Sequence, residues 1–94
     1  MPFPKQAGRP FTQADVESLK QNQRGVYGLY RPGVWIYIGK GNLRLRLLDH
    51  LYGDNPCITR EGPTHWVGEL TTNMDARERQ LILEFDPICN RRVG

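Results

Sequence analysis

The sequence has no long hydrophobic run, which argues against a membrane protein. No apolar stretch approaches the about 18 residues that a membrane-spanning helix needs. The N-terminus also lacks the pattern of a signal peptide, in which a charged stretch precedes an apolar one. The 94 residues, of which 38% are hydrophobic, suffice for one domain with a modest core. We therefore expect a single cytoplasmic domain over residues 1–94, with no membrane partner and with residues 1–11 as an N-terminal arm.

Cysteine is also scarce. Cys57 and Cys89 are far apart in the sequence and form no C-x-x-C pair. This pattern favours two reduced thiols over a disulfide. A zinc site that combined them with His50 and His65 would lack the paired ligand spacing typical of zinc.

Acidic residues are absent from positions 18–48, although the net charge of the whole chain is only +3. The charged side chains of this segment are Lys20, Arg24, Arg31, Lys40, Arg44 and Arg46. A segment with charge of one sign is typical of a protein that binds a polyanion such as nucleic acid. On charge alone, a solvated basic surface explains it equally well.

Hydrophobic periodicity predicts helices and strands in the order α-β-β-α-β-α. Thr12 and Asp15 have the spacing of a capping box for the first helix, and residues 52–64 have the composition of a loop. The fold class is therefore α/β (α+β), with a small three-stranded antiparallel sheet flanked by helices. The expected helices cover residues 12–22, 43–51 and 74–85, and the expected strands cover residues 26–30, 34–38 and 65–70.

Tyr27 and Tyr37 fall on the two strands of the predicted hairpin. A three-residue loop over residues 31–33 gives a register that places both rings on one face of the sheet. Simple alternation adds Trp35 to that face and gives the opposite face to Val34, Ile36 and Ile38. The two phenols could stack on bases or transfer protons. Tyrosine also has a high intrinsic propensity for strands, which would explain both positions without a function.

A carboxylate interrupts the apolar stripe of the last predicted helix. Glu78 is spaced to lie among Met74, Leu81, Ile82 and Phe85. A buried carboxylate is costly unless it is paired or binds a metal. We expect either a salt bridge to an arginine or a role as a metal ligand or catalytic carboxylate.

Taken in order, these residues resemble the GIY-YIG endonuclease family over positions 25–90. Gly25-Val26-Tyr27 and Tyr37-Ile38-Gly39 resemble its two signature triplets. The resemblance continues through Lys40, Asn42-Leu43, Arg46, Glu78, Leu81-Ile82, Pro87 and Asn90. It implies an endonuclease that hydrolyses phosphodiester bonds in DNA with one divalent metal, Mg²⁺ or Mn²⁺. The alternative is a nucleic-acid-binding module that does not cut, for which a carboxylate at position 78 has no use.

The resemblance also implies roles for individual residues. Glu78 would be the single protein ligand of the metal, Arg46 would hold the scissile phosphate, Tyr27 and Tyr37 would line the site, and Asn90 would brace it. His50 and Lys40 match residues found in some members of the family. The residues expected to contact the substrate are Lys40, Arg44, Arg31 and Arg24.

The chemistry of the reaction suggests further assignments. Tyr27 is expected to be the general base, with its pKa lowered by Lys40, Arg46 and the metal, and His50 is expected to accept the proton onward. Arg44 is the alternative to Arg46 for the phosphate, and spacing favours Arg46 because it lies one helical turn before His50.

A single small domain offers few contacts to bases, which favours single-stranded or branched DNA over a long duplex recognition site. Duplex DNA remains open, with a homodimer supplying two active sites for a double-strand cut. On single-stranded DNA, the two tyrosines and Trp35 could stack on bases.

Overall fold

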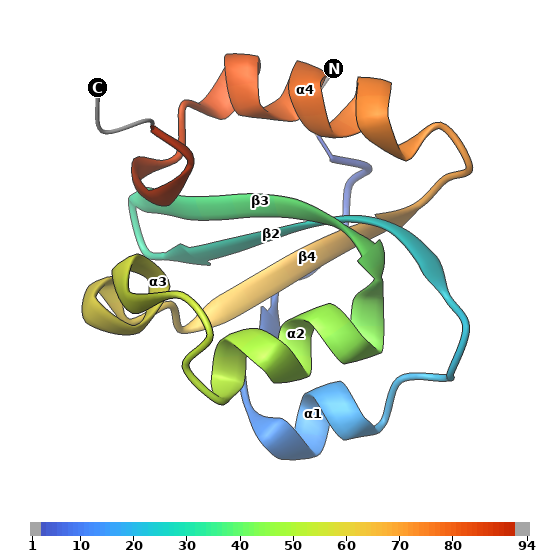
Figure 1. Ribbon diagram of the computed structural model, residues 1–94, viewed down its shortest axis with the longest axis horizontal. Helices are drawn as coiled ribbons and strands as arrows, with labels where there is room; N and C mark the ends of the chain where they lie inside the picture. The colour runs from blue at the N-terminus through green and yellow to red at the C-terminus, as the bar shows by residue number, and fades with distance from the viewer. Residues whose placement is uncertain (1–2, 92–94) are drawn as a thin grey trace.

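The computed structural model describes residues 3–91 and places a four-stranded antiparallel sheet between helices (Figure 1). The strand order is β1-β4-β2-β3. The strands are β1 (Arg9–Pro10), β2 (Arg24–Arg31), β3 (Val34–Asn42) and β4 (His65–Leu70). The predicted fold class is confirmed, with one addition. The fourth strand is the two-residue β1, through which the N-terminal segment pairs with β4.

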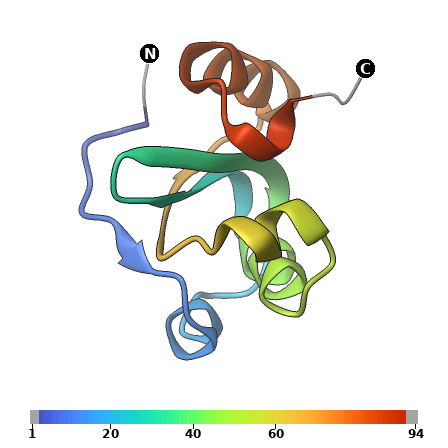
Figure 2. The same ribbon diagram turned by 90° about the vertical axis from the view of Figure 1, so that its left-hand side faces the viewer.

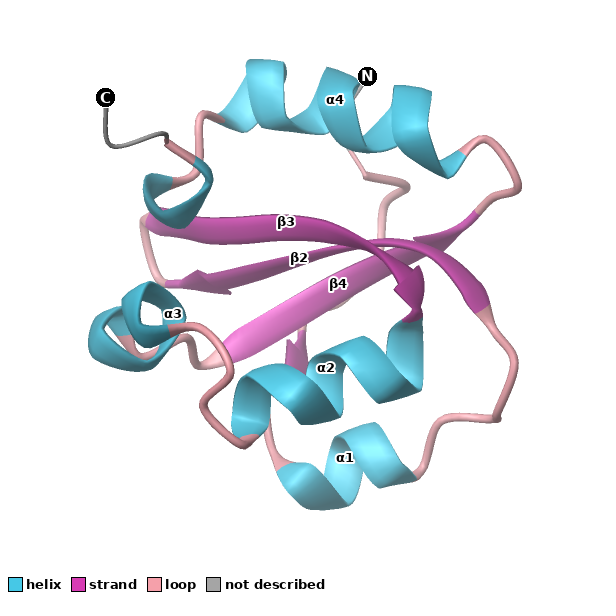
Figure 3. Cartoon of the chain, in the orientation of Figure 1, coloured by secondary structure: helices cyan, strands magenta, loops and turns pink. Residues whose placement is uncertain are grey.

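Figures 2 and 3 show that the helices lie on both sides of the sheet, with α4 over one face and α1 and α2 on the other. The elements are α1 (Gln13–Glu17), α2 (Leu43–Leu51), α3 (Pro56–Glu61), α4 (Met74–Phe85) and the 3₁₀ turn η1 (Ile88–Asn90). The predicted limits of α2, β4 and the C-terminus of α4 are confirmed. Within the described residues, no helix is long and apolar enough to cross a membrane.

The first helix is shorter than predicted. The Thr12 hydroxyl accepts a hydrogen bond from the Asp15 N–H, as expected of an N-cap. The helix nevertheless ends at Glu17 instead of near residue 22. Val16 is its one fully enclosed side chain, so little apolar surface favours a longer helix.

The prediction of a loop over residues 52–64 is wrong in its middle, because α3 lies there. The Asn55 side chain accepts hydrogen bonds from the N–H groups of Cys57 and Ile58, and Pro56 occupies the first turn. Gly62 ends the helix in the left-handed conformation. This short helix buries only Ile58, so it gives no apolar periodicity in the sequence.

The β2–β3 hairpin turns over two residues and contains a β-bulge. Arg31 pairs with Val34, so the predicted three-residue loop is wrong. An extra residue in β3 then shifts the register beyond Leu29. Beyond this shift Leu29 pairs with Tyr37, so Tyr27 and Tyr37 share a face of the sheet as predicted.

The bulge also overturns the simple alternation predicted for β3. Trp35 packs under α4 against Phe3 and Phe85, with ring centroids 5.8 and 4.6 Å away. Ile36 instead joins the core cluster on the side of α1 and α2, whereas Ile38 joins the cluster on the side of α4. Trp35 therefore lies on the face opposite the two tyrosines and is not placed to stack on bases there.

Cys57 and Cys89 form a disulfide with a Cα–Cα distance of 5.7 Å. The prediction of two reduced thiols is therefore wrong. The bond joins α3 to η1, two elements that only the folded chain brings together. Because both thiols are used in the bond, neither serves the zinc site considered above.

Candidate active site

Two tyrosines and a histidine meet on the face of the sheet that carries α2. Tyr27 comes from β2 and Tyr37 from β3, and their ring centroids are 6.3 Å apart. The ring of His50, in the last turn of α2, lies 5.6 Å from Tyr27 and 5.2 Å from Tyr37. The helix α2, which follows β3 directly, runs back along the sheet toward α3 (Figure 1).

A chain of hydrogen bonds runs from Tyr27 through His50 to the loop after α2. The Tyr27 Oη lies 2.6 Å from His50 Nε2. The other ring nitrogen, Nδ1, lies 2.8 Å from the carboxylate of Asp54. The sequence analysis did not single out Asp54. Its spacing from His50, one helical turn onward, was the available signal.

Arg46 belongs to the same cluster, and Arg44 does not. The Arg46 guanidinium lies 2.9 Å from the Asp49 carboxylate and 3.9 Å from that of Asp54. Its positive charge also acts on both phenols. Arg44 instead lines a separate hollow at the start of α2. Residues two apart on a helix point in different directions, so one helix cannot bring both arginines to the tyrosines.

Burial dominates the acid–base chemistry of this cluster. Burial raises the pKa of Tyr27 far above its ordinary value, and the Arg46 charge only partly opposes the rise. The sequence analysis expected Lys40, Arg46 and the metal to lower the pKa of Tyr27. For the protein groups alone this expectation is wrong, because burial outweighs the positive charge. Burial lowers the pKa of His50, against an opposing effect of Asp54, so the imidazole is neutral at pH 7.

The glycines of the two triplets make room for the tyrosines and for the sheet. A Cβ on Gly39, which pairs with Tyr27 across β2 and β3, would lie 2.3 Å from the Tyr27 Oη. A Cβ on Gly25 would lie 2.0 Å from the backbone oxygen of Glu69 in the neighbouring β4. Neither distance is compatible with a side chain. The motif thus requires glycine at both positions for reasons of space.

Glu78 lies on α4, which covers the face of the sheet opposite α2 (Figure 3). Its side chain is 23% exposed, and its closest cation is Lys40, whose Nζ lies 3.6 Å away and also pairs with Asp75. The salt-bridge alternative therefore involves a lysine of β3 and not an arginine. The negative charge of Glu78 raises the pKa of Tyr37, as burial does, which shows that the α4 and α2 sides of the site interact electrostatically.

The surroundings of Glu78 fit a metal with one protein ligand. Among residues 3–91, no group of three or more histidine, cysteine, aspartate or glutamate side chains could hold an ion together. Glu78 and Lys40 line a hollow of about 490 Å³ that is open to solvent. A second carboxylate, that of Asp75, lines the same hollow and pairs with Lys40. Mg²⁺ prefers oxygen ligands and usually retains several waters, so Glu78 as one protein ligand in an open hollow suits it.

Asn90 acts on the backbone beside the site. Its side-chain oxygen accepts a hydrogen bond from the Ile38 N–H at 2.7 Å, and its amide nitrogen donates to the Ile38 carbonyl at 2.9 Å. The residue thus binds the strand position that follows Tyr37. This geometry agrees with the bracing role that the resemblance implied.

The remaining predicted substrate contacts lie outside the cluster. Arg24 is exposed at the start of β2, next to the hollow that contains Leu70 and Met74. Arg31 lies at the opposite end of β2 and forms a salt bridge of 3.2 Å with Glu61. The structure therefore does not bring Arg31 to the tyrosines.

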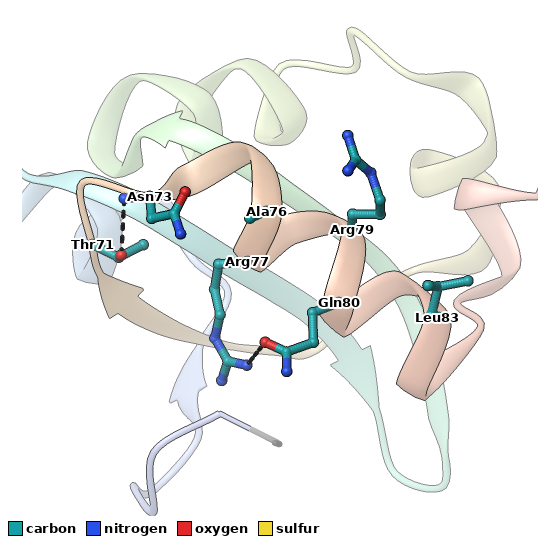
Figure 4. A pocket seen from close by; sticks show the side chains of 7 residues that line it. All are labelled: Thr71, Asn73, Ala76, Arg77, Arg79, Gln80 and Leu83. Atoms are coloured by element: carbon teal, nitrogen blue, oxygen red, sulfur yellow. Dashed lines mark hydrogen bonds between the residues drawn. The ribbon is translucent and has the colours of Figure 1, made fainter.

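A further hollow of about 480 Å³ lies along the outer side of α4 (Figure 4). Arg77 turns toward Gln80 within it, while Arg79 points to the other side of the helix. None of the predicted site residues lines this hollow. It is separate from the tyrosine cluster.

Comparison with solved structures gives three point-mutant structures of one protein domain. They are the GIY-YIG N-terminal endonuclease domain of UvrC from Thermotoga maritima, described as bound to its catalytic divalent cation. The TM-scores are 0.71–0.72 at 27–28% sequence identity, over 85% of this chain and 96% of that domain. No family model matches the sequence, and no curated relative does. The fold comparison confirms the resemblance that the motifs indicated.

Proposed function

We propose that this chain, which has the fold of the GIY-YIG endonuclease domains, hydrolyses phosphodiester bonds in DNA with one divalent cation, Mg²⁺ or Mn²⁺. The observation that carries the proposal is the buried hydrogen bond of 2.6 Å between Tyr27 and a neutral His50, with Arg46 beside it. A buried donor and acceptor next to a basic side chain form an acid–base pair. A module that only binds DNA has no need of one.

Glu78 is the residue that would hold the cation. The bound ion would neutralise charge on the scissile phosphate and stabilise the leaving oxygen. Lys40, at 3.6 Å from Glu78, would carry additional positive charge to the same side of the phosphate. The similar UvrC domain is described as bound to its catalytic divalent cation, which supports this assignment.

Tyr27 and His50 would move the proton. The Tyr27 phenol gives its proton to His50 Nε2 as it takes one from the attacking water. The water oxygen forms the new bond to phosphorus, the bond to the leaving oxygen breaks, and that oxygen takes up a proton from solvent. Because burial disfavours a free phenolate, we expect the two proton transfers to be concerted.

Arg46 and Tyr37 would position the phosphate. The Arg46 guanidinium offers a planar set of donors that suits two phosphate oxygens. Tyr37, on the same face as Tyr27, would orient the water or an oxygen of the phosphate. Asn90 would hold the Ile38 backbone, and thereby Tyr37, in place.

The substrate that we propose is single-stranded or branched DNA. Arg24 and Arg44 line hollows at the starts of β2 and α2, where they can contact phosphates away from the catalytic residues. Such contacts set affinity without reading sequence. Trp35 is excluded from a stacking role by its place under α4. Cutting of both strands of a duplex would instead require two sites, as in a homodimer.

The test compares cleavage of end-labelled single-stranded, branched and duplex DNA with Mg²⁺, with Mn²⁺ and with a chelator. We expect metal-dependent cutting that Glu78→Ala abolishes. The matched control is Glu84→Ala, which removes an exposed carboxylate from the same helix. Metal-independent binding without cutting, unchanged by Glu78→Ala, would contradict the proposal and leave the alternative of a DNA-binding module.

A further inference from the structure

The loop after α2 supplies a carboxylate to the buried acid–base pair. Asp54 Oδ1 lies 2.8 Å from His50 Nδ1, while Tyr27 occupies Nε2 on the other side of the ring. The histidine side chain is 1% exposed, because both of its ring nitrogens are covered by protein groups. The ring is therefore held between two protein groups whose donor and acceptor properties decide where its proton lies.

The two partners allow only one useful arrangement of protons. A carboxylate accepts hydrogen bonds and cannot donate one, so it binds Nδ1 when that nitrogen carries the proton. Nε2 then has a free lone pair directed at the Tyr27 hydroxyl. In a neutral ring without Asp54, the opposite tautomer is also accessible, and in it Nε2 would donate to Tyr27 and could not take its proton.

We propose that Asp54 is a positioning residue of the active site, which holds His50 in the Nδ1–H tautomer so that Nε2 accepts the proton of Tyr27. The arrangement has the logic of the serine protease triad, with a phenol in place of the alcohol. The catalytic part of this inference rests on the proposed function, whereas the tautomer is a property of the protein alone.

The local structure holds Asp54 in place. Its backbone N–H donates to the Asp49 carbonyl at 3.2 Å, which closes the end of α2. The next residue, Asn55, caps α3, and α3 is joined to η1 by the disulfide. The carboxylate is therefore anchored from both sides along the chain.

Asp54 has a second neighbour, and the test must separate the two. Its Oδ2 lies 3.9 Å from Arg46, which lies closer to Asp49, at 2.9 Å. Asp49→Asn removes the negative charge that pairs with Arg46 but leaves the hydrogen bond between Asp54 and His50 Nδ1 intact. It is therefore the matched control for Asp54→Asn.

The first measurement is the proton position in the unmodified protein, by ¹⁵N NMR of the histidine rings at neutral pH. The chain has only two histidines, and His65→Gln identifies the His50 signals. We expect a protonated Nδ1 and a bare Nε2, both unchanged in Asp49→Asn, and a mixture of tautomers in Asp54→Asn. A proton on Nε2 in the unmodified protein overturns the inference, even if the Asp54 variant fails to fold.

The second measurement is cleavage of single-stranded DNA with Mg²⁺ against pH. The charged and titratable groups around His50 are Tyr27 from β2, Tyr37 from β3, Arg46 and Asp49 from α2, and Asp54. Activity should fall as pH decreases through the pKa of His50, because the imidazolium cannot accept the proton. Asp54 raises the pKa of His50, so Asp54→Asn should move this loss to lower pH.

We expect kcat to fall by about 10²- to 10⁴-fold in Asp54→Asn, by analogy with loss of the orienting carboxylate in such triads. KM for DNA should change little, because Asp54 contacts His50 and Arg46 through its carboxylate and is not among the residues proposed to bind the phosphates. An unchanged kcat together with an unchanged tautomer would overturn the inference. If the unmodified protein does not cut any DNA, the proposed function fails, and the NMR result still decides the role of Asp54 in fixing the ring.

Discussion

At the scale of single residues, Tyr27 combines two opposing effects. Full burial raises its pKa, which opposes the formation of a phenolate. The hydrogen bond to the neutral His50 provides an acceptor 2.6 Å from the hydroxyl. The side chain therefore stays protonated at rest, and in the proposed mechanism it gives its proton to His50 as it takes one from the attacking water.

We predict that Tyr27→Phe lowers the cleavage rate by about 10²- to 10⁴-fold, as expected for loss of a general base. The substitution keeps the ring and removes only the hydroxyl, so the sheet should stay folded. The measurement is single-turnover cleavage of single-stranded DNA with Mg²⁺. Tyr52→Phe is the control, because Tyr52 is 68% exposed at the end of α2. A Tyr27→Phe rate close to that of the unmodified protein would refute the general-base assignment.

At the scale of elements, the C-terminal turn η1 links the fold to the site. Asn90 binds both backbone groups of Ile38, and the preceding Cys89 is joined to α3. One short element therefore connects β3, which carries Tyr37, with α3, which follows Asp54. The disulfide holds both of these segments at the site.

We predict that Cys89→Ser lowers the free energy of unfolding by about 2–4 kcal/mol, because the unfolded chain loses a cross-link. Urea denaturation of the oxidised protein, the reduced protein and the variant measures the change. Reductant should destabilise the unmodified protein and leave Cys89→Ser unaffected. Equal stability of the oxidised and reduced proteins would contradict the prediction.

At the scale of the whole molecule, the acid-free segment is divided among several elements. Lys40 pairs with Glu78 and Arg46 lies beside Tyr27, while Arg24 and Arg44 line separate hollows at the starts of β2 and α2. Arg31 belongs to the same segment of the sequence but pairs with Glu61. The positive charge that the sequence groups together is therefore only partly available to DNA.

We predict that Arg44→Ala weakens binding of a single-stranded oligonucleotide and lowers the slope of log affinity against log salt by about one charge. Arg31→Ala should change the slope less, because its guanidinium is already engaged by Glu61. Fluorescence anisotropy across a range of salt concentrations, with a chelator present to prevent cutting, measures both variants. A larger effect of Arg31→Ala than of Arg44→Ala would show that Arg31 contacts the substrate and would contradict the prediction.

The sequence by itself determined the features that depend on local spacing. Periodicity placed α2 and β4, and the apolar stripe of α4 identified Glu78 as an unusual carboxylate. The pair Arg46 and His50 followed from helical spacing, because residues four apart share one side of a helix. The two triplets indicated the fold, which the comparison with solved structures confirmed.

Only the tertiary structure decided the features that depend on contacts between distant segments. The bulge in β3 sent Trp35 to the opposite face, and a single inserted residue leaves no signature in a two-residue period. The disulfide required η1 to fold back against α3. Asp54 reached His50 from a segment predicted to be an undifferentiated loop. Likewise, the direction of the Tyr27 pKa shift was set by burial, which depends on how much of the folded chain encloses the ring.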